Sequence, residues 1–379
     1  MNGFDIPVYR PWISDEDVRA ITRVAAAGWI SSSAPEVQHF EREIAAFVGA
    51  AHGVATMNGT AALHLAFRSL GIGAGDEVII PDLSFVAPAA MVLAAGARPV
   101  FADVSRLDWN ITAKEITHLR TAKTKAVVVV HVYGNPADVD TMREAAKGLL
   151  LIEDVAEAFG ARRNGQRAGS QGDVATFSFY GNKIVTTGEG GMLTTDDPEL
   201  AERMRFLRDH AMSKQRKYFH PEVGWNYRMT ALQAALGRSQ LRRVEAILAE
   251  KRRIAEGYEE RLADLEEIVL HPRQISDSES VFWMYSILAP ELETRDYIIR
   301  QLVEAGIETR PFFIPISTMP PYRTFSTGRP LPISAELAER GLNLPSGPLL
   351  TDHDLDRICD TIRRALKSPA RPRQLVPAA

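Results

Sequence analysis

The sequence contains a single cysteine, Cys359, among its 379 residues. One cysteine cannot form a disulfide within the chain, nor can it supply the several thiolates of a metal cluster. It lies in a helical pattern near the C-terminus, so we interpret it as a small buried hydrophobic residue and not as a nucleophile. An internal disulfide and a thiolate metal cluster are thereby excluded.

Long hydrophobic runs are also missing. The longest, such as Ala126–Val130 and Leu149–Ile152, are far too short to cross a bilayer. The first residues, MNGFDIPVYRPW, contain no charged segment followed by an apolar run, so we expect no signal peptide. The sequence therefore predicts a cytoplasmic protein with no membrane partner.

The chain has no excess of basic charge. Its 44 lysines and arginines are offset by 48 aspartates and glutamates, which gives a formal net charge of −4. Proteins that hold nucleic acid through a broad electrostatic field carry a clear positive excess. We therefore expect no nucleic-acid partner.

Two common cofactor signals are absent as well. Gly71, Gly73 and Gly75 resemble a dinucleotide-binding loop, but they precede a predicted strand instead of following one into a helix. An NAD-dependent oxidoreductase is therefore disfavoured, and no metal site is expected. The histidines lack the spacing of metal ligands; they include His52, His64, His131, His210 and His220.

From about residue 50 onward, short β-rich runs alternate with helical patterns. Val, Ile and Leu fill the predicted strands without alternating polar residues, which is typical of strands covered on both faces. The pattern indicates an α/β protein with a mainly parallel sheet and helices on each side. The predicted strands are Val54–Met57, Glu77–Ile80, Pro99–Val104, Ala126–Val132, Leu149–Glu153, Val174–Phe179 and Gly191–Thr195. The helices between them are Gly59–Leu70, Ala87–Ala95, one after Asp138, and Ala201–Leu207.

The pattern changes after a long helical stretch, Ala231–Leu262, which is long enough to bridge two domains. We expect a large α/β domain over residues 1–245 and a smaller α+β domain over residues 246–379. The elements predicted for the smaller domain are Ile268–His271, Val281–Leu288, a helix Thr294–Ala305 and a last helix Leu355–Leu366.

Ligands of open α/β sheets bind beyond the carboxyl ends of the strands, so the residues found there are candidates for a site. Asn58-Gly59-Thr60-Ala61 follows the first strand and opens a helix. The free N–H groups of such a helix start suit a phosphate. Taken by themselves, these residues are better explained by a plain capped helix start.

An acidic residue, Asp154, ends the apolar strand Leu149–Glu153. A buried carboxylate is costly without a partner, and the protonated nitrogen of a pyridine ring is one partner that would suit it. Glu157 would reach the same ligand if the chain turns helically there. The alternative is an aspartate that caps a following helix.

A lysine, Lys183, lies in a short loop between two predicted strands, with glycines on both sides of it. A lysine that forms a Schiff base must enter a crevice, where desolvation lowers the pKa of its amine. Nearby, Ser178 offers a hydroxyl to a phosphate. The alternative is an ordinary solvated lysine.

At these residues the sequence resembles the DegT/DnrJ/StrS family of nucleotide-sugar aminotransferases. The resemblance covers nearly the whole chain, and its most specific stretch is FSFYGNKIVTTGEGG, Phe177–Gly191. It implies the aspartate aminotransferase-like fold (fold type I of the enzymes that use pyridoxal 5'-phosphate, PLP) and a homodimer. Further support comes from HVYGNP at 131–136, EDVAEAFG at 153–160 and GWNYRM at 224–229.

The resemblance also implies a role for individual residues. Lys183 would form the Schiff base with PLP, Asp154 would pair with its pyridine nitrogen, and Glu157 would lie near its ring hydroxyl. Phe85 would stack on the ring, and Asn226 would reach the cofactor phosphate from the neighbouring subunit. The phosphate contacts within the chain would be Gly59, Thr60, Ala61 and Ser178. The segments near the sugar nucleotide would contribute Trp29, Ser31, Ser32, Arg310 and Phe312.

The implied reaction moves the amino group of L-glutamate to a keto sugar carried on a nucleotide. The acceptor that we favour is GDP-4-keto-6-deoxy-D-mannose, which would give GDP-perosamine. A dTDP- or UDP-linked sugar, a 3-keto isomer and a related ring without a nucleotide remain open. A hypothesis from another class is a regulatory protein that keeps the fold without catalysis, although Lys183 and Asp154 speak against it.

Overall fold

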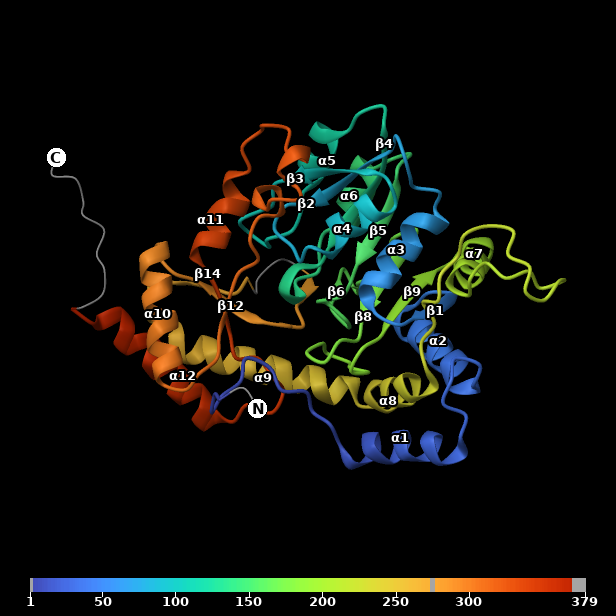
Figure 1. Cartoon of the computed structure of the whole chain (residues 1–379). Coiled ribbons are helices and arrows are strands. Elements are labelled where there is room, and N and C mark those ends of the chain that lie inside the picture. Colours follow the sequence, from blue (N-terminus) through green and yellow to red (C-terminus); the bar gives the residue numbers. More distant parts are fainter. Residues whose placement is uncertain (1–2, 273–276, 370–379) are drawn as a thin grey trace.

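The computed structural model describes residues 3–272 and 277–369, and a seven-stranded sheet forms its centre (Figure 1). β9 runs opposite to the other six strands, so the mainly parallel sheet predicted from the sequence is confirmed. In spatial order the strands are β1 (His52–Thr56), β9 (Gly191–Thr195), β8 (Val174–Ser178), β5 (Leu150–Asp154), β4 (Thr124–Val130), β2 (Glu77–Pro81) and β3 (Arg98–Ala102).

Both faces of this sheet are covered, as the apolar strands require. Along β4, Val128 and Val130 pack toward α3 and α4, whereas Val127 and Val129 pack toward α5 and α6. Successive side chains of a strand point to opposite faces, so an unbroken apolar run belongs between two helical layers. The helices are α3 (Gly59–Ser69), α4 (Ala87–Ala94), α5 (Ala113–Leu119) and α6 (Val139–Ala145).

At the β1 end of the sheet, α7 joins α3 on one face, while α2 and α8 cover the other. α1 packs along α8 outside this layer (Figure 1). The sequence prediction contains no helix before residue 50, although Ser14 and Asp17 form a reciprocal capping box at the start of α1. These helices are α1 (Asp15–Ala27), α2 (Pro35–Val48), α7 (Pro198–Arg208) and α8 (Ala231–Arg242).

The long helix predicted over Ala231–Leu262 is divided at Arg243, where α8 ends and α9 (Val244–Leu262) begins. Arg243 has φ −110° and ψ 8°, outside the helical range. Its Nη2 donates hydrogen bonds to Asp17 Oδ2 at 2.6 Å and to the carbonyl oxygen of Trp12 at 3.1 Å. A distant buried carboxylate thus holds the arginine at the break, and the helical pattern of the sequence contains no sign of that contact.

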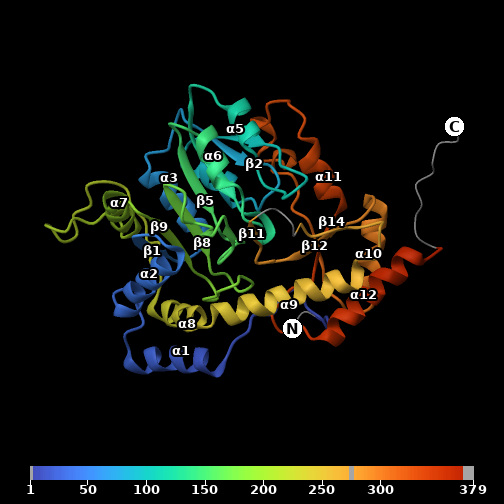
Figure 2. The same cartoon turned by 180° about the vertical axis from the view of Figure 1, so that it is seen from behind.

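The C-terminal part of the chain forms a second, four-stranded antiparallel sheet. α9 packs into the core of the large sheet through Val244 and Leu248 and into the core of the small sheet through Tyr258 and Leu262. Figures 1 and 2 show α9 running from one part of the molecule to the other. The elements here are β10 (Val269–Leu270), β12 (Tyr285–Leu288), β14 (Gly341–Leu344), β13 (Arg310–Pro311), α10 (Leu292–Glu304), α11 (Pro332–Arg340) and α12 (Asp352–Lys367).

The expected division into residues 1–245 and 246–379 stays a prediction. Its second part includes residues 273–276 and 370–379, which lie outside the described residues. A core shared by both parts joins Val78 and Ile80 of the large sheet to Trp283 and Phe312. A small third sheet also links them, formed by β11 (Ser278–Glu279), β6 (Arg162–Arg163) and β7 (Gln166–Arg167).

Neither a membrane-spanning helix nor a cluster of metal ligands is found in the described ranges. Within residues 3–272 and 277–369, no helix is long and apolar enough to cross a membrane. In the same ranges, no group of three or more His, Cys, Asp or Glu side chains is arranged to hold a metal ion.

Candidate active site

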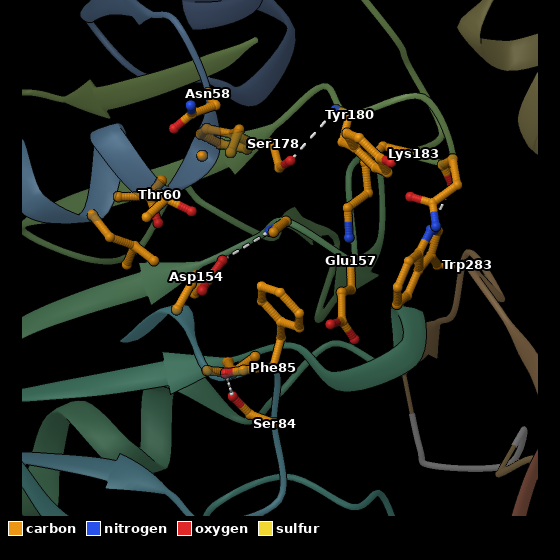
Figure 3. A pocket seen from close by; sticks show the side chains of 18 of the residues that line it. Asn58, Thr60, Ser84, Phe85, Asp154, Glu157, Ser178, Tyr180, Lys183 and Trp283 are labelled. Carbon is orange, nitrogen blue, oxygen red and sulfur yellow. Dashed lines mark hydrogen bonds between the residues drawn. The ribbon is translucent and has the colours of Figure 1, made fainter. Parts of the chain in front are cut away.

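A cavity of about 400 Å³ lies at the carboxyl ends of β4, β5 and β8 and at the N-terminus of α3. The C-terminal part of the chain contributes Trp283, Arg310 and Phe313 to its wall. Open α/β sheets bind their ligands at this edge, so the cavity lies where the sequence placed the site (Figure 3). The predicted residues that line it are Gly59, Thr60, Phe85, Asp154, Glu157, Ser178, Lys183 and Arg310.

Asp154 is the last residue of β5, and it is buried at the cavity wall. Its Oδ1 accepts a hydrogen bond from the backbone N–H of Ala156 at 3.0 Å, and the chain turns here without forming a helix. The aspartate therefore caps a turn and not the helix that was the alternative. Burial raises the pKa of its carboxyl, against the charge of Lys183 and this hydrogen bond. Such a carboxyl gains stability from a cationic partner in the cavity.

Glu157 is a second buried carboxyl in the same wall. Its Oε2 accepts a hydrogen bond from the backbone N–H of Tyr133 at 2.8 Å, which fixes the direction of the side chain. Burial raises the pKa of Glu157 to about 7, although the positive charge of Lys183 opposes the rise. Two acidic groups of raised pKa thus lie beside one lysine, an arrangement that is frequent in active sites.

Lys183 lies in the loop between β8 and β9, and its backbone N–H donates to the carbonyl oxygen of Tyr180 at 2.9 Å. Its Nζ lies 3.6 Å from the centre of the Trp283 ring (Figure 3). Burial lowers the pKa of its amine, while Glu157 and Asp154 favour the charged form. Compared with a solvated lysine, the amine is therefore more available as a neutral nucleophile.

The N-terminus of α3 meets the end of β8 at the other side of the cavity. Asn58 caps the helix, because its side chain accepts from the N–H of Ala61 at 2.8 Å. The N–H groups of Gly59 and Thr60 precede the first intrahelical donors and have no partner within the helix. A Cβ on Gly59 would lie 2.8 Å from Cβ of Ser178, so glycine alone leaves this corner open. Main-chain N–H groups and hydroxyls at a helix start form a suitable place for a phosphate.

Phe85 presents its ring to the cavity and remains 55% exposed. In Figure 3 the ring lies between Asp154 and Glu157. The ring of Phe313 is 6.1 Å from it, measured between centres. An exposed aromatic ring inside a cavity is available to stack on a flat ligand.

Several predicted residues lie outside this cavity. Asn226 is exposed and pairs with Asp209 through an isolated β-bridge, and Ala61 directs its N–H to the Asn58 cap. Three more lie outside the cavity, after α1: Trp29 and Ser31 are exposed, and Ser32 is partly buried.

The aromatic pair Phe312 and Phe313 divides between core and cavity. Phe312 is buried against Trp109 and Tyr133, so its side chain lies in the core and does not line the cavity. Phe313 lines the cavity in its place. Neighbouring side chains of an extended segment point to opposite sides, and the sequence does not show which of two adjacent phenylalanines turns inward.

The sequence pattern does not single out Trp283, which comes from a segment far from the cavity loops in sequence. An apolar residue at the start of a predicted strand carries no sign of such a role. Tyr180 also lines the cavity. The sequence could have identified it, because it belongs to the glycine-flanked motif of Lys183.

Comparisons with known proteins bear on this site. The model of the DegT/DnrJ/EryC1/StrS aminotransferase family matches residues 11–363. The chain belongs to this family. A GDP-perosamine synthase of Caulobacter vibrioides is 46% identical over 342 residues, which cover 89% of this chain and 92% of that protein. A GDP-perosamine synthase of Escherichia coli O157:H7 is 39% identical over 359 residues, covering 94% and 97%. The PLP form of Spr1654, a putative sugar aminotransferase of Streptococcus pneumoniae, superimposes with a TM-score of 0.90 at 26% identity, covering 96% and 98%.

Family membership confirms the main expectations from the sequence. The fold is that of PLP-dependent sugar aminotransferases, and the chain is an enzyme of that class. PLP is its cofactor, because the aminotransferases of this family depend on it. The hypothesis of a protein without catalytic activity is not favoured by any feature of the cavity.

Proposed function

We propose that this enzyme transfers the amino group of L-glutamate to GDP-4-keto-6-deoxy-D-mannose and so forms GDP-perosamine. The observation that carries the chemistry is the amine of Lys183, held in a cavity beside the buried carboxyls of Asp154 and Glu157. The choice of acceptor is supported by the GDP-perosamine synthases at 46% and 39% identity, each matched over most of both chains.

The residues of the cavity fit PLP. We assign the aldehyde end to Lys183, the pyridine nitrogen to Asp154, the ring hydroxyl to Glu157 and the ring face to Phe85. The phosphate end fits the corner that Gly59 leaves open. There we assign the contacts to Gly59, Thr60, Ala61 and Ser178. Ala61 would contribute only as part of the helix N-terminus, because its own N–H already donates to the side chain of Asn58.

When bound, PLP supplies an electron sink that makes the α-proton of an amino acid removable. The chain must then move that proton. We assign this to Lys183, whose Nζ takes the proton from the α-carbon of glutamate and, in the second half of the reaction, gives one to C4 of the sugar. A lysine of lowered pKa suits both tasks, because it exchanges protons at a pH nearer neutrality than a solvated lysine does.

Asp154 would keep the pyridine nitrogen protonated. Its buried carboxyl has a raised pKa, so it stays ionised most readily when a cation lies next to it. A ring nitrogen that carries a proton provides this cation, and each group then stabilises the charge of the other.

We assign recognition of the sugar nucleotide to the rim of the cavity, through Arg310, and to the surface residues Trp29, Ser31 and Ser32.

The proposal includes a homodimer whose active sites are shared. The loop after α7 extends away from the body of the molecule (Figure 1), and Asn226 follows it, where the chain pairs again with Asp209. Within it Tyr218 is 77% exposed, and Phe219 is exposed as well. Exposed aromatic side chains of this kind are typical of protein interfaces. We place Asn226 at the cofactor phosphate of the partner subunit.

Within its own chain, Phe312 contributes to the substrate site only by supporting Phe313.

The decisive experiment is incubation of the purified enzyme with L-glutamate and a panel of nucleotide-linked keto sugars, read out by mass spectrometry. GDP-4-keto-6-deoxy-D-mannose is expected to be the best acceptor and to yield GDP-perosamine. Preference for a dTDP- or UDP-linked sugar, or for a 3-keto isomer, would contradict the assigned acceptor. Lack of any amination, with bound PLP unchanged by glutamate, would indicate a regulatory protein. The cytoplasmic location stays a prediction.

A further inference from the structure

The indole of Trp283 contacts the Lys183 segment twice. Its ring lies under the lysine amine, with Nζ 3.6 Å from the ring centre (Figure 3). Its Nε1–H donates a hydrogen bond to the carbonyl oxygen of Asn182 at 2.7 Å. One side chain from the C-terminal part of the chain thus holds both the amine of Lys183 and the backbone immediately before it.

A second aromatic residue holds the same backbone from the N-terminal segment. The hydroxyl of Tyr9 donates to the carbonyl oxygen of Lys183 at 3.2 Å. Consecutive carbonyl groups, those of Asn182 and Lys183, are therefore bound by side chains more than a hundred residues away in each direction. Such contacts stiffen a loop that would otherwise be held mainly by its own turns.

Behind both aromatic residues lies a buried lysine, Lys251 of α9, which is only 1% exposed. Its Nζ donates to the carbonyl oxygen of Trp283 at 3.1 Å and also to that of Ser346. The same Nζ lies 5.2 Å from the ring centre of Tyr9. In residues 3–272 and 277–369, no carboxylate forms an ion pair with it. Burying a lysine without an acidic partner costs free energy of folding. The position of Lys251 between Trp283 and Tyr9 therefore needs a physical explanation.

We propose that Trp283 is a positioning residue for Lys183, and that Lys251 fixes Trp283 in the place where its ring holds the lysine amine. The inference rests on the proposed function only in treating Lys183 as the reactive amine. It assigns a task to residues that neither the family match nor the motif of Lys183 singles out.

The proposal has an electrostatic consequence for the amine. The charged or titratable groups that act on Lys183 are Glu157, Asp154 and Arg310, and the face of the Trp283 ring adds a fourth influence. An aromatic face attracts an ammonium group and not a neutral amine. The ring therefore offsets part of the fall in the pKa of Lys183 that burial causes.

The first test measures the pKa of Lys183 in the full-length apoprotein. Competitive acetylation at several pH values, followed by mass spectrometry of the Lys183 peptide, reports it without any substrate. Trp283→Leu removes the ring and should lower this pKa by about one unit. Trp283→Phe keeps an aromatic face and should leave the pKa near that of the parent. The matched control is Trp12→Leu, which removes a tryptophan with a cation–π contact to Arg243 outside the cavity.

A pKa that is unchanged or raised in Trp283→Leu would overturn the electrostatic part of the proposal. Equal shifts in Trp283→Leu and Trp12→Leu would overturn it as well, because they would show a general effect of losing a tryptophan. In turnover, Trp283→Leu should lower kcat by about tenfold to a hundredfold with little change in KM, since the amine is displaced while the substrate contacts remain.

The second test concerns Lys251. Lys251→Met keeps the length of the side chain and removes the donor, and it should speed hydrogen exchange in the loop 180–188. Lys125→Met, at an exposed position of β4, is the matched control and should leave the exchange unchanged. If Lys251→Met does not fold, Tyr9→Phe removes only the hydroxyl that binds Lys183 and should loosen the same loop. Unaltered protection of this loop in the folded variants would overturn the anchoring role.

These outcomes separate the inference from the proposed function. If the pKa and exchange effects occur while no keto sugar is aminated, the positioning role stands and the proposed reaction fails. If sugars are aminated while Trp283→Leu leaves the pKa of Lys183 unchanged, the reaction stands and the positioning role fails.

Discussion

Gly59 and Ser178 approach each other so closely that a Cβ on Gly59 would lie 2.8 Å from Cβ of Ser178. The contact joins the start of α3 to the end of β8, two elements that are far apart in the sequence. Both positions belong to the corner assigned to the phosphate of PLP. The free space in this corner therefore depends on the missing side chain at residue 59.

Gly59→Ala is expected to weaken PLP binding by about tenfold or more, because the methyl group forces α3 and β8 apart or fills the phosphate corner. Titration of the apoprotein with PLP, followed by absorbance, measures the change. Gly73→Ala is the control, since a Cβ there would meet Ala95 O at 3.6 Å, an ordinary contact. Equal affinities in the two variants would contradict the assignment of the phosphate corner.

Asp154→Asn should reduce kcat by about a hundredfold to a thousandfold, because a neutral amide cannot keep the pyridine nitrogen protonated. The affinity for PLP should change less, since the phosphate and ring contacts remain. Steady-state kinetics and PLP titration separate the two effects. A variant that keeps its rate but melts at a lower temperature would show that Asp154 serves only the turn at Ala156.

The stability of the apoprotein should depend on pH through Glu157. In the folded chain its pKa is raised to about 7 by burial, whereas its ordinary value is 4.5. Between these pH values the folded chain binds more protons than the unfolded chain, so this group's contribution to the free energy of unfolding falls as the pH rises. Glu157→Gln removes that contribution.

Thermal melts of apoprotein from pH 4.5 to 7 provide the measurement. The Tm of the parent should fall relative to that of Glu157→Gln by several degrees across this range. Parallel curves for the two proteins would mean that Glu157 ionises in the folded chain as it does in water. With PLP bound, the difference should diminish, because new partners then face the carboxyl.

Subunit mixing tests the shared active site. Lys183→Ala is expected to lower turnover by roughly a thousandfold or more, because the nucleophile and the proton carrier are lost together. Asn226→Ala should weaken the phosphate site of the partner subunit. In a mixed dimer one site carries both lesions and the other carries neither, so activity should partly return after subunit exchange. Proven heterodimers without any recovery would place Asn226 in its own subunit's site.

The amino-acid sequence alone predicted the central sheet and singled out Asp154 and Lys183, which both line the cavity. The apolar run of β4 has no polar alternation, and a strand of that kind must be covered on both faces. Asp154 and Lys183 stood out because a charged residue follows a buried strand in one case and glycines flank a short loop in the other. These signals are local, since periodicity and neighbouring residues carry them.

Only the tertiary structure decided which distant side chains complete the cavity. Trp283 lines the cavity and binds the carbonyl oxygen of Asn182, and Tyr9 of the N-terminal segment binds that of Lys183. The break between α8 and α9 at Arg243 depends on the contact with Asp17. Phe313 faces the cavity because Phe312 packs into the core against Tyr133. Local periodicity does not record contacts between segments so far apart, because many pairings of distant segments satisfy the same hydrophobic pattern. Packing in three dimensions selects one of them.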